Sequence, residues 1–234
     1  MYSRGSRLQV CFAAVLSIGV FGCKEKTAPP PEPAAASTAA TAKPAVEARD
    51  TRPVIVAFGD SLTAGYGTDA GNSYPDFLER DLNAKGFHYH VVNAGISGNT
   101  TKDGVERLDE VVALKPAVAI VDFGGNDGLR GLPIDSTRKN LDQIVSTLEG
   151  AGTKVVLGGI TLPPNYGADY IHQFNETYAL LARKYHLPLL PFLLQGVYGT
   201  EGGMQADGIH ATAQGNQQVA RNLLPLVTPL LHKQ

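Results

Sequence analysis

Three side chains that could carry out nucleophilic catalysis lie at two distant points of the sequence. Ser61 closely follows the apolar run 54–58, and Asp207 stands three residues before His210. A serine at the end of a buried strand exposes its hydroxyl at the edge of the sheet, where its own N–H faces any oxyanion that forms. A carboxylate in the same short loop can hold the tautomer of an imidazole and stabilise its charged form. These residues favour acyl transfer to serine, although a helix cap and an exposed Asp-Gly turn would explain the same fragments.

Two further turns contain residues suited to binding an oxyanion. Gly98 lies in the segment 93–100, and Asn126 follows two glycines in the segment 123–128. Glycine allows the backbone to approach a ligand closely, and a carboxamide can point an N–H into the same cleft. Both segments are equally typical of ordinary turns between a strand and a helix. The serine does not lie in a G-x-S-x-G elbow, because Thr63 stands where the second glycine would be.

Alternating strand-like and helix-like segments indicate how these residues are positioned. The apolar runs of strand length are 54–58, 91–92, 118–121, 155–157 and 187–190. The amphipathic segments are 73–85, 101–114, 136–149, 168–185 and 212–231, the last expected to break or bend at Pro225. Continuous apolar strands are typical of a sheet buried on both faces, and the alternation favours parallel strands. We expect an α/β fold, a three-layer α/β/α sandwich with a five-stranded parallel sheet and its functional groups at the carboxyl ends of the strands.

The composition of the chain disfavours several classes of protein and of site. The chain has 234 residues, a formal net charge of −2 and 18% charged residues, which suits one domain with a tail and disfavours a nucleic-acid binder. The two cysteines, Cys11 and Cys23, lie near the start, so no disulfide or cysteine-based metal site is expected in the rest. His88 and His90 could pair on a metal, but no third ligand is evident, and a solvated strand edge is the favoured interpretation. We expect no metal and no organic cofactor.

The first 52 residues have the features of an export and anchoring segment. Residues 1–22 resemble a secretory signal, with a positively charged start and an apolar run that is short for a membrane span. The segment ends in V-F-G-C, which resembles a bacterial lipobox and makes Cys23 the candidate lipidation site. Residues 23–52 are rich in Ala and Pro and predict a disordered linker, leaving 53–234 as the domain. We expect a lipid-anchored protein on the periplasmic side of the cell envelope, or a secreted or periplasmic one if Cys23 is not used.

The four blocks around Ser61, Gly98, Asn126 and His210, in this order, resemble the SGNH hydrolases, also called the GDSL esterase/lipase family. The resemblance runs from residue 54 to the end of the chain. Within the family, the chain is most similar to the bacterial periplasmic acyl-CoA thioesterase/lysophospholipase/arylesterase group. The segments that carry this similarity are 96–100, 124–131 and 162–167. The resemblance implies a flavodoxin-like α/β/α sandwich.

The resemblance also implies a role for each matched residue. Ser61 would be the nucleophile, His210 its general base and Asp207 the residue that orients the histidine. The backbone N–H groups of Ser61 and Gly98 and the side-chain amide of Asn126 would form the oxyanion hole.

Two positions depart from the family pattern. Ala211 follows the histidine where many relatives have Pro, and this should alter loop stiffness and leave the chemistry unchanged. Asn99 stands where close relatives often carry Asp.

Substrate selection is expected to depend on two loops that would flank the cleft. The candidate substrate-binding residues in them are Leu129, Arg130, Leu162, Pro163 and Tyr166. The glycines of the segment 128–133 would let it move when substrate binds. The resemblance implies a serine esterase acting on aryl esters, short or medium acyl esters, lysophospholipids or acyl thioesters, and we expect a monomer. A carbohydrate O-deacetylase is disfavoured by the absence of Trp, and a non-catalytic binding lipoprotein by the intact triad.

Overall fold

The structure is a computed structural model that describes residues 50–233. The expected signal segment 1–22, the candidate lipidation site Cys23 and the linker residues up to 49 lie outside the described residues. Among the helices of the described part, none has the length and apolar character needed to cross a bilayer.

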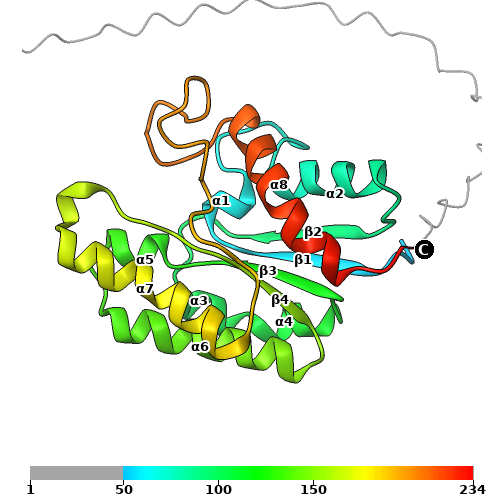
Figure 1. The fold of residues 1–234 in the computed structure, drawn as a ribbon, viewed down its shortest axis with the longest axis horizontal. Helices are drawn as coiled ribbons and strands as arrows, with labels where there is room; N and C mark the ends of the chain where they lie inside the picture. The colour runs from blue at the N-terminus through cyan, green and yellow to red at the C-terminus, as the bar shows by residue number, and fades with distance from the viewer. Residues whose placement is uncertain (1–49, 234) are drawn as a thin grey trace, which may run out of the picture. The chain divides into compact units, whose positions relative to one another are not determined.

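Five parallel strands form one sheet at the centre of the domain (Figure 1). They are β1 (Val54–Gly59), β2 (His90–Gly95), β3 (Val118–Asp122), β4 (Lys154–Gly158) and β5 (Leu189–Leu190). Their order is β2-β1-β3-β4-β5, with every neighbouring pair parallel. This is the strand order of flavodoxin-like folds, in which ligands bind at the carboxyl ends of the strands. The expected five-stranded α/β/α sandwich is confirmed.

Helices cover both faces of the sheet, and α2 and α8 lie together on one of them (Figure 1). The longer helices are α2 (Tyr74–Ala84), α6 (Ile134–Gly150), α7 (Ala168–Tyr185) and α8 (Ala213–Val227). The shorter ones are α1 (Ser61–Ala64), α3 (Thr101–Glu106), α4 (Leu108–Ala113) and α5 (Gly125–Leu129), with 3-10 turns at Pro164–Tyr166 and Thr228–Leu230. Two capping boxes explain where helices begin, because Ser73 pairs with Asp76 before α2 and Thr100 with Asp103 before α3.

Two expected helices are interrupted. The segment 101–114, expected as one helix, is divided at Arg107, whose backbone leaves the helical region (φ −110°, ψ 14°). The Arg107 side chain donates hydrogen bonds to the carbonyl oxygens of Gly59 and Ala94, both at 2.8 Å. The segment 212–231 is expected to break or bend at Pro225; the structure places Pro225 inside α8, which ends two residues later at Val227 and is followed by a 3-10 turn.

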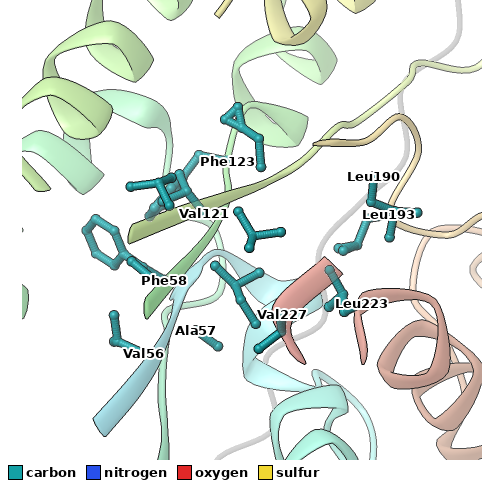
Figure 2. Packing of buried hydrophobic residues seen from close by; sticks show 14 of the residues in the cluster. Val56, Ala57, Phe58, Val121, Phe123, Leu190, Leu193, Leu223 and Val227 are labelled. Atoms are coloured by element: carbon teal, nitrogen blue, oxygen red, sulfur yellow. The ribbon is translucent and has the colours of Figure 1, made fainter. Parts of the chain in front are cut away.

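The hydrophobic core lies on both faces of the sheet, as the continuous apolar strands predict. The side chains of β1 and β3 pack against residues of α8 and of the chain after β5 (Figure 2). Phe58 and Phe123 are fully buried and meet edge to face, with ring centroids 4.9 Å apart. Truncating a buried Phe to Ala costs about 3–5 kcal/mol, so this pair fixes the strand ends firmly.

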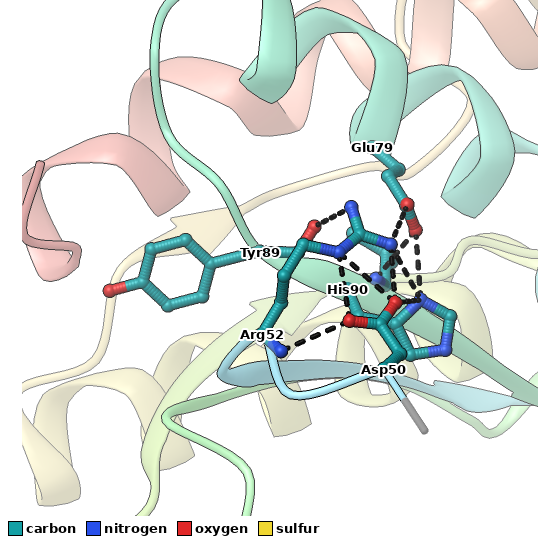
Figure 3. A network of polar contacts seen from close by, with 6 residues as sticks. Asp50, Arg52, Glu79, Tyr89 and His90 are labelled. Atoms are coloured by element: carbon teal, nitrogen blue, oxygen red, sulfur yellow. Dashed lines mark hydrogen bonds and ion pairs between the residues drawn. The ribbon is translucent and has the colours of Figure 1, made fainter. Parts of the chain in front are cut away.

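A polar network lies where the described chain begins, at the amino end of the sheet (Figure 3). Arg52 donates to the carbonyl oxygen of Tyr89 at 3.0 Å and pairs with Asp50 at 2.6 Å and Glu79 at 2.8 Å. The Nδ1 atom of His90 lies 3.3 Å from the Glu79 carboxylate, so His90 belongs to this network. Asp50 and Arg52 were expected to be linker, but they contact the domain. The chain therefore enters the domain at the edge of the sheet opposite the carboxyl ends of the strands.

Candidate active site

Ser61 begins α1 immediately after β1. Asp60 caps this helix by accepting a hydrogen bond from the N–H of Leu62 at 3.0 Å. Gly59 is required before it, because a Cβ atom there would overlap the Asp122 carboxylate and the Thr63 hydroxyl. The close approach of β1 to these two side chains places the Ser61 hydroxyl at the carboxyl edge of the sheet.

The structure brings together Ser61, Asp207 and His210. His210 Nε2 lies 2.9 Å from Ser61 Oγ, although the two residues are 149 positions apart. Its Nδ1 lies 2.7 Å from Asp207 Oδ2, and the other Asp207 oxygen accepts hydrogen bonds from the N–H groups of Ile209 and His210. A carboxylate at Nδ1 fixes the tautomer that carries its proton there, which leaves Nε2 free to accept a proton from serine.

Asp207 is held in its ionised form. Desolvation raises the pKa of its carboxyl group, but the hydrogen bonds from the His210 ring and from the N–H groups of Ile209 and His210 outweigh that effect and lower the pKa to about 2. Asp207 therefore carries a negative charge that can stabilise a protonated His210 throughout the neutral pH range.

Gly98 and Asn126, the other expected oxyanion-hole residues, border the same cavity as Ser61. Gly98 has φ +83°, a left-handed conformation that favours glycine. Asn126 lies in α5, and its Nδ2 donates to Asp60 Oδ2 at 3.1 Å and to the carbonyl oxygen of Asn99 at 2.9 Å. Both amide protons are therefore used within the protein. Binding of an oxyanion by Asn126 requires that one of these bonds be shared or replaced.

Asp60 connects the serine helix to Asn126. Only 2% of its surface is exposed, and desolvation raises the pKa of its carboxyl group to about 6, against the opposing effect of the hydrogen bonds from the Leu62 N–H and the Asn126 amide. Its carboxylate thus holds the amide at one end and the start of α1 at the other.

Two further buried carboxylates, which the sequence did not single out, lie beneath the site. Asp122, at the end of β3, accepts hydrogen bonds from the hydroxyls of Thr63 and Tyr74, and burial raises the pKa of its carboxyl group well above the usual value. Asp127 accepts from both the N–H and the hydroxyl of Thr101. Asp122 directly follows the apolar run 118–121 and Asp127 lies two residues after a glycine pair, but both positions are equally typical of ordinary turns.

The side chain of Asn99 accepts a hydrogen bond from Arg107. Its guanidinium lies 4.5 Å above the Phe58 ring and donates through Nε to Asn99 Oδ1 at 2.8 Å. Asn99 in turn accepts the Asn126 amide through its backbone oxygen. An aspartate at position 99 would make an ion pair with Arg107, whereas this chain makes a hydrogen bond to a neutral side chain.

A cavity of about 530 Å³ opens beside Ser61 and His210, and its walls are mostly apolar. Leu129, Leu162 and Pro163 line it as expected. Arg130 and Tyr166 do not. Arg130 donates to the carbonyl oxygen of Gly98 at 2.9 Å, and Tyr166 donates to that of Leu129 at 2.8 Å, so both side chains are turned onto the backbone of the neighbouring loops.

The cavity also contains residues that the sequence did not reveal. Apolar side chains that line it come from the loops after α1, β4 and β5 and from the loop before α8. They are Tyr66, Ile160, Phe192, Leu194, Tyr198 and Ile209. Periodicity cannot identify such residues, because loops carry no repeating pattern. The movement expected of segment 128–133 stays a prediction.

Comparison with known proteins places the chain among hydrolases. Residues 57–218 match the model of the GDSL-like Lipase/Acylhydrolase family. Esterase TesA of Pseudomonas aeruginosa is 40% identical over 178 residues, covering 76% of this chain and 89% of that protein. Thioesterase 1/protease 1/lysophospholipase L1 of Escherichia coli K12 is 36% identical over 179 residues, covering 76% and 85%.

A solved structure of an esterase has a similar fold. The psychrotrophic esterase EstA from Pseudoalteromonas sp., inhibited by monoethylphosphonate, superimposes with a TM-score of 0.71 at 26% identity, covering 75% of this chain and 97% of that one.

Proposed function

The chain belongs to the GDSL-like lipase/acylhydrolase family and is a carboxylic ester hydrolase of the TesA type, and on that premise we propose that it cleaves aryl esters, short- and medium-chain acyl esters, lysophospholipids and acyl thioesters through an acyl-Ser61 intermediate. The hydrogen-bonded chain from Ser61 through His210 to Asp207 is the single observation that carries this proposal.

The proposed reaction has two halves. Ser61 Oγ attacks the acyl carbon while His210 Nε2 takes its proton, and Asp207 stabilises the imidazolium that results. The tetrahedral oxyanion is bound by the N–H groups of Ser61 and Gly98 and by the Asn126 amide. His210 then gives the proton to the departing alcohol or thiol. Water repeats the sequence on the acyl-serine, releasing the carboxylic acid and restoring Ser61.

The cavity supports a neutral, apolar acyl or aryl group. Its deeper wall contains the buried side chains of Ile160, Leu162 and Leu194. No Lys or Arg is among the lining residues in the described part of the chain, so nothing there would hold a phosphate by charge. The volume lies within the range of about 300–1,000 Å³ that is usual for small-molecule sites. The charged part of a lysolipid or acyl-CoA would then remain outside the cavity.

A substrate panel tests this proposal. Nitrophenyl esters of increasing chain length, a lysophosphatidylcholine, an acyl-CoA and an acetylated xylan are offered to the wild-type chain and to Ser61→Ala. We expect turnover of the nitrophenyl esters with a preference for short or medium chains, and no turnover by the variant. Hydrolysis of the acetylated sugar alone would support the deacetylase instead, and equal rates in both proteins would exclude Ser61 as the nucleophile.

The N-terminal sequence supports attachment to a membrane through Cys23, with the signal segment removed and the domain on the periplasmic side. The residues between Cys23 and Asp50 could extend about 90 Å at the maximum rise per residue. Metabolic labelling with a palmitate analogue should mark the wild-type chain and leave Cys23→Ala unlabelled. Labelling that persists in the variant would contradict this assignment.

A further inference from the structure

Gln205 is a half-buried glutamine that donates three hydrogen bonds around His210. Its Nε2 donates to the carbonyl oxygen of Tyr66 at 2.7 Å and to that of Ala211 at 2.8 Å. Its backbone N–H donates to the carbonyl oxygen of His210 at 2.8 Å. A carbonyl oxygen only accepts, so two carbonyl partners require the NH₂ end of the side chain to face them. All the N–H protons of Gln205 are therefore engaged beside His210.

The two side-chain partners of Gln205 belong to the two segments that carry the reacting residues. Tyr66 belongs to the turn after α1, the helix that begins with Ser61, whereas Ala211 directly follows His210. The Tyr66 ring also lies against the His210 imidazole, with centroids 4.6 Å apart. The Gln205 amide thus connects the main chain on the serine side to the main chain on the histidine side.

The turn after α1 is shaped to receive this amide. Gly67 has φ +75°, and a Cβ atom there would overlap the Gln205 carboxamide. The loop that carries Asp207 and His210 is closed by an antiparallel bridge between Met204 and Ala211. The residues between them include Asp207 and Gly208, which are exposed. The Gln205 side chain therefore links this loop to the Tyr66 turn, in addition to the contact between the Tyr66 ring and His210.

We propose that Gln205 is a positioning residue for His210, an inference that rests on the proposed function. Its amide fixes the separation between the Tyr66 turn and Ala211, and so keeps His210 Nε2 within hydrogen-bond distance of Ser61 Oγ. Gln205 does not line the cavity. Loss of its amide should therefore lower kcat and leave KM for a small ester nearly unchanged, because a misplacement of about 1 Å is enough to slow an oriented reaction strongly.

Two substitutions remove the amide donors while keeping the size of the side chain. Gln205→Met has a similar length and no polar group, and Gln205→Glu keeps the shape without the N–H donors. Gln218→Met is the matched control, since it loses one side-chain bond, to Asn222 on α8, outside the cavity. With nitrophenyl butyrate we expect kcat to fall about tenfold or more in both Gln205 variants and to stay at the wild-type value in the control. If the Met variant does not fold, the Glu variant provides the comparison.

A double-mutant cycle separates positioning of His210 from a general effect on the fold. In a His210→Ala background there is no imidazole to position, so adding Gln205→Met should leave the residual rate unchanged. The same fold-loss in both backgrounds would overturn the proposal, as would a wild-type kcat in the single variants. An inactive wild-type chain would instead contradict the proposed function, so the two failures are distinguishable.

Discussion

Replacing Asn126 with alanine removes a carboxamide that serves the reaction and the fold together. It borders the cavity beside Ser61 and donates to Asp60 Oδ2 at 3.1 Å and to the Asn99 carbonyl at 2.9 Å. Loss of one oxyanion donor lowers kcat by about 10²–10³-fold, equivalent to about 2.7–4 kcal/mol of transition-state stabilisation. KM should change much less, because this donor acts mainly on charge that develops in the transition state.

The same substitution should destabilise the fold in a pH-dependent way. Asp60 is 2% exposed, and it would lose the one side-chain donor that it has among residues 50–233. A hydrogen bond to a charged group contributes about 1.5–3 kcal/mol. The pKa of Asp60 is already raised to about 6 by desolvation, and loss of the Asn126 amide would raise it further. At pH 5 the carboxyl group is mostly protonated in either protein, so the stability lost should be smaller at pH 5 than at pH 8.

Steady-state hydrolysis of a nitrophenyl ester measures the first effect, and urea unfolding at the two pH values measures the second. Asn175→Ala, on an exposed position of α7, is the matched control and should change neither. A kcat within about threefold of wild type would refute the role of Asn126 in binding the oxyanion. An equal loss of stability at both pH values would refute the account of Asp60.

Three other substitutions test neighbouring parts of the site. Ser61→Ala should abolish ester hydrolysis while circular dichroism and the melting temperature stay close to wild type; measurable turnover above background would contradict the mechanism. Asp207→Asn should lower kcat by at least about 10²-fold at pH 8, because the imidazole loses the partner that fixes its tautomer, and an unchanged rate would contradict this role. Asp60→Asn should flatten the pH dependence of the unfolding free energy between about pH 4 and 6. Because the pKa of Asp60 is raised to about 6 in the folded wild-type chain, the folded chain keeps a proton that the unfolded chain releases. Asp60 therefore lowers the stability of the wild-type chain as the pH rises through that window. Denaturant titrations that show the same pH dependence in both proteins would exclude this assignment.

The sheet could be predicted from the sequence because its strands are continuous apolar runs, and the family resemblance supplied the four blocks at their ends. Periodicity placed α7 at 168–185, the range that the structure shows. It did not separate α3 from α4, because the break depends on the inward turn of the Arg107 side chain onto two carbonyl oxygens. It also missed α1 and α5, which have only four and five residues, too few to show a helical pattern.

The walls of the cavity were less predictable than the polar groups beside it. Leu129, Leu162 and Pro163 were identified because they lie in the matched segments. Arg130 and Tyr166 lie in those segments too, yet their side chains bond to backbone oxygens. Phe192 and Tyr198 line the cavity from a loop with no recognised motif. Which way a loop side chain points is decided by tertiary contacts, and neighbouring residues in the sequence do not report those contacts.

Covalent labelling of the intact chain with a fluorophosphonate tests the arrangement of Ser61, His210 and Asp207 most directly. Such a reagent is attacked by an activated serine and leaves a stable phosphonyl adduct whose mass and position are read by mass spectrometry. One adduct on Ser61 is predicted, formed rapidly by the wild-type chain and far more slowly by His210→Ala. An adduct on another residue, or labelling of Ser61 at the same rate without the histidine, would contradict the account.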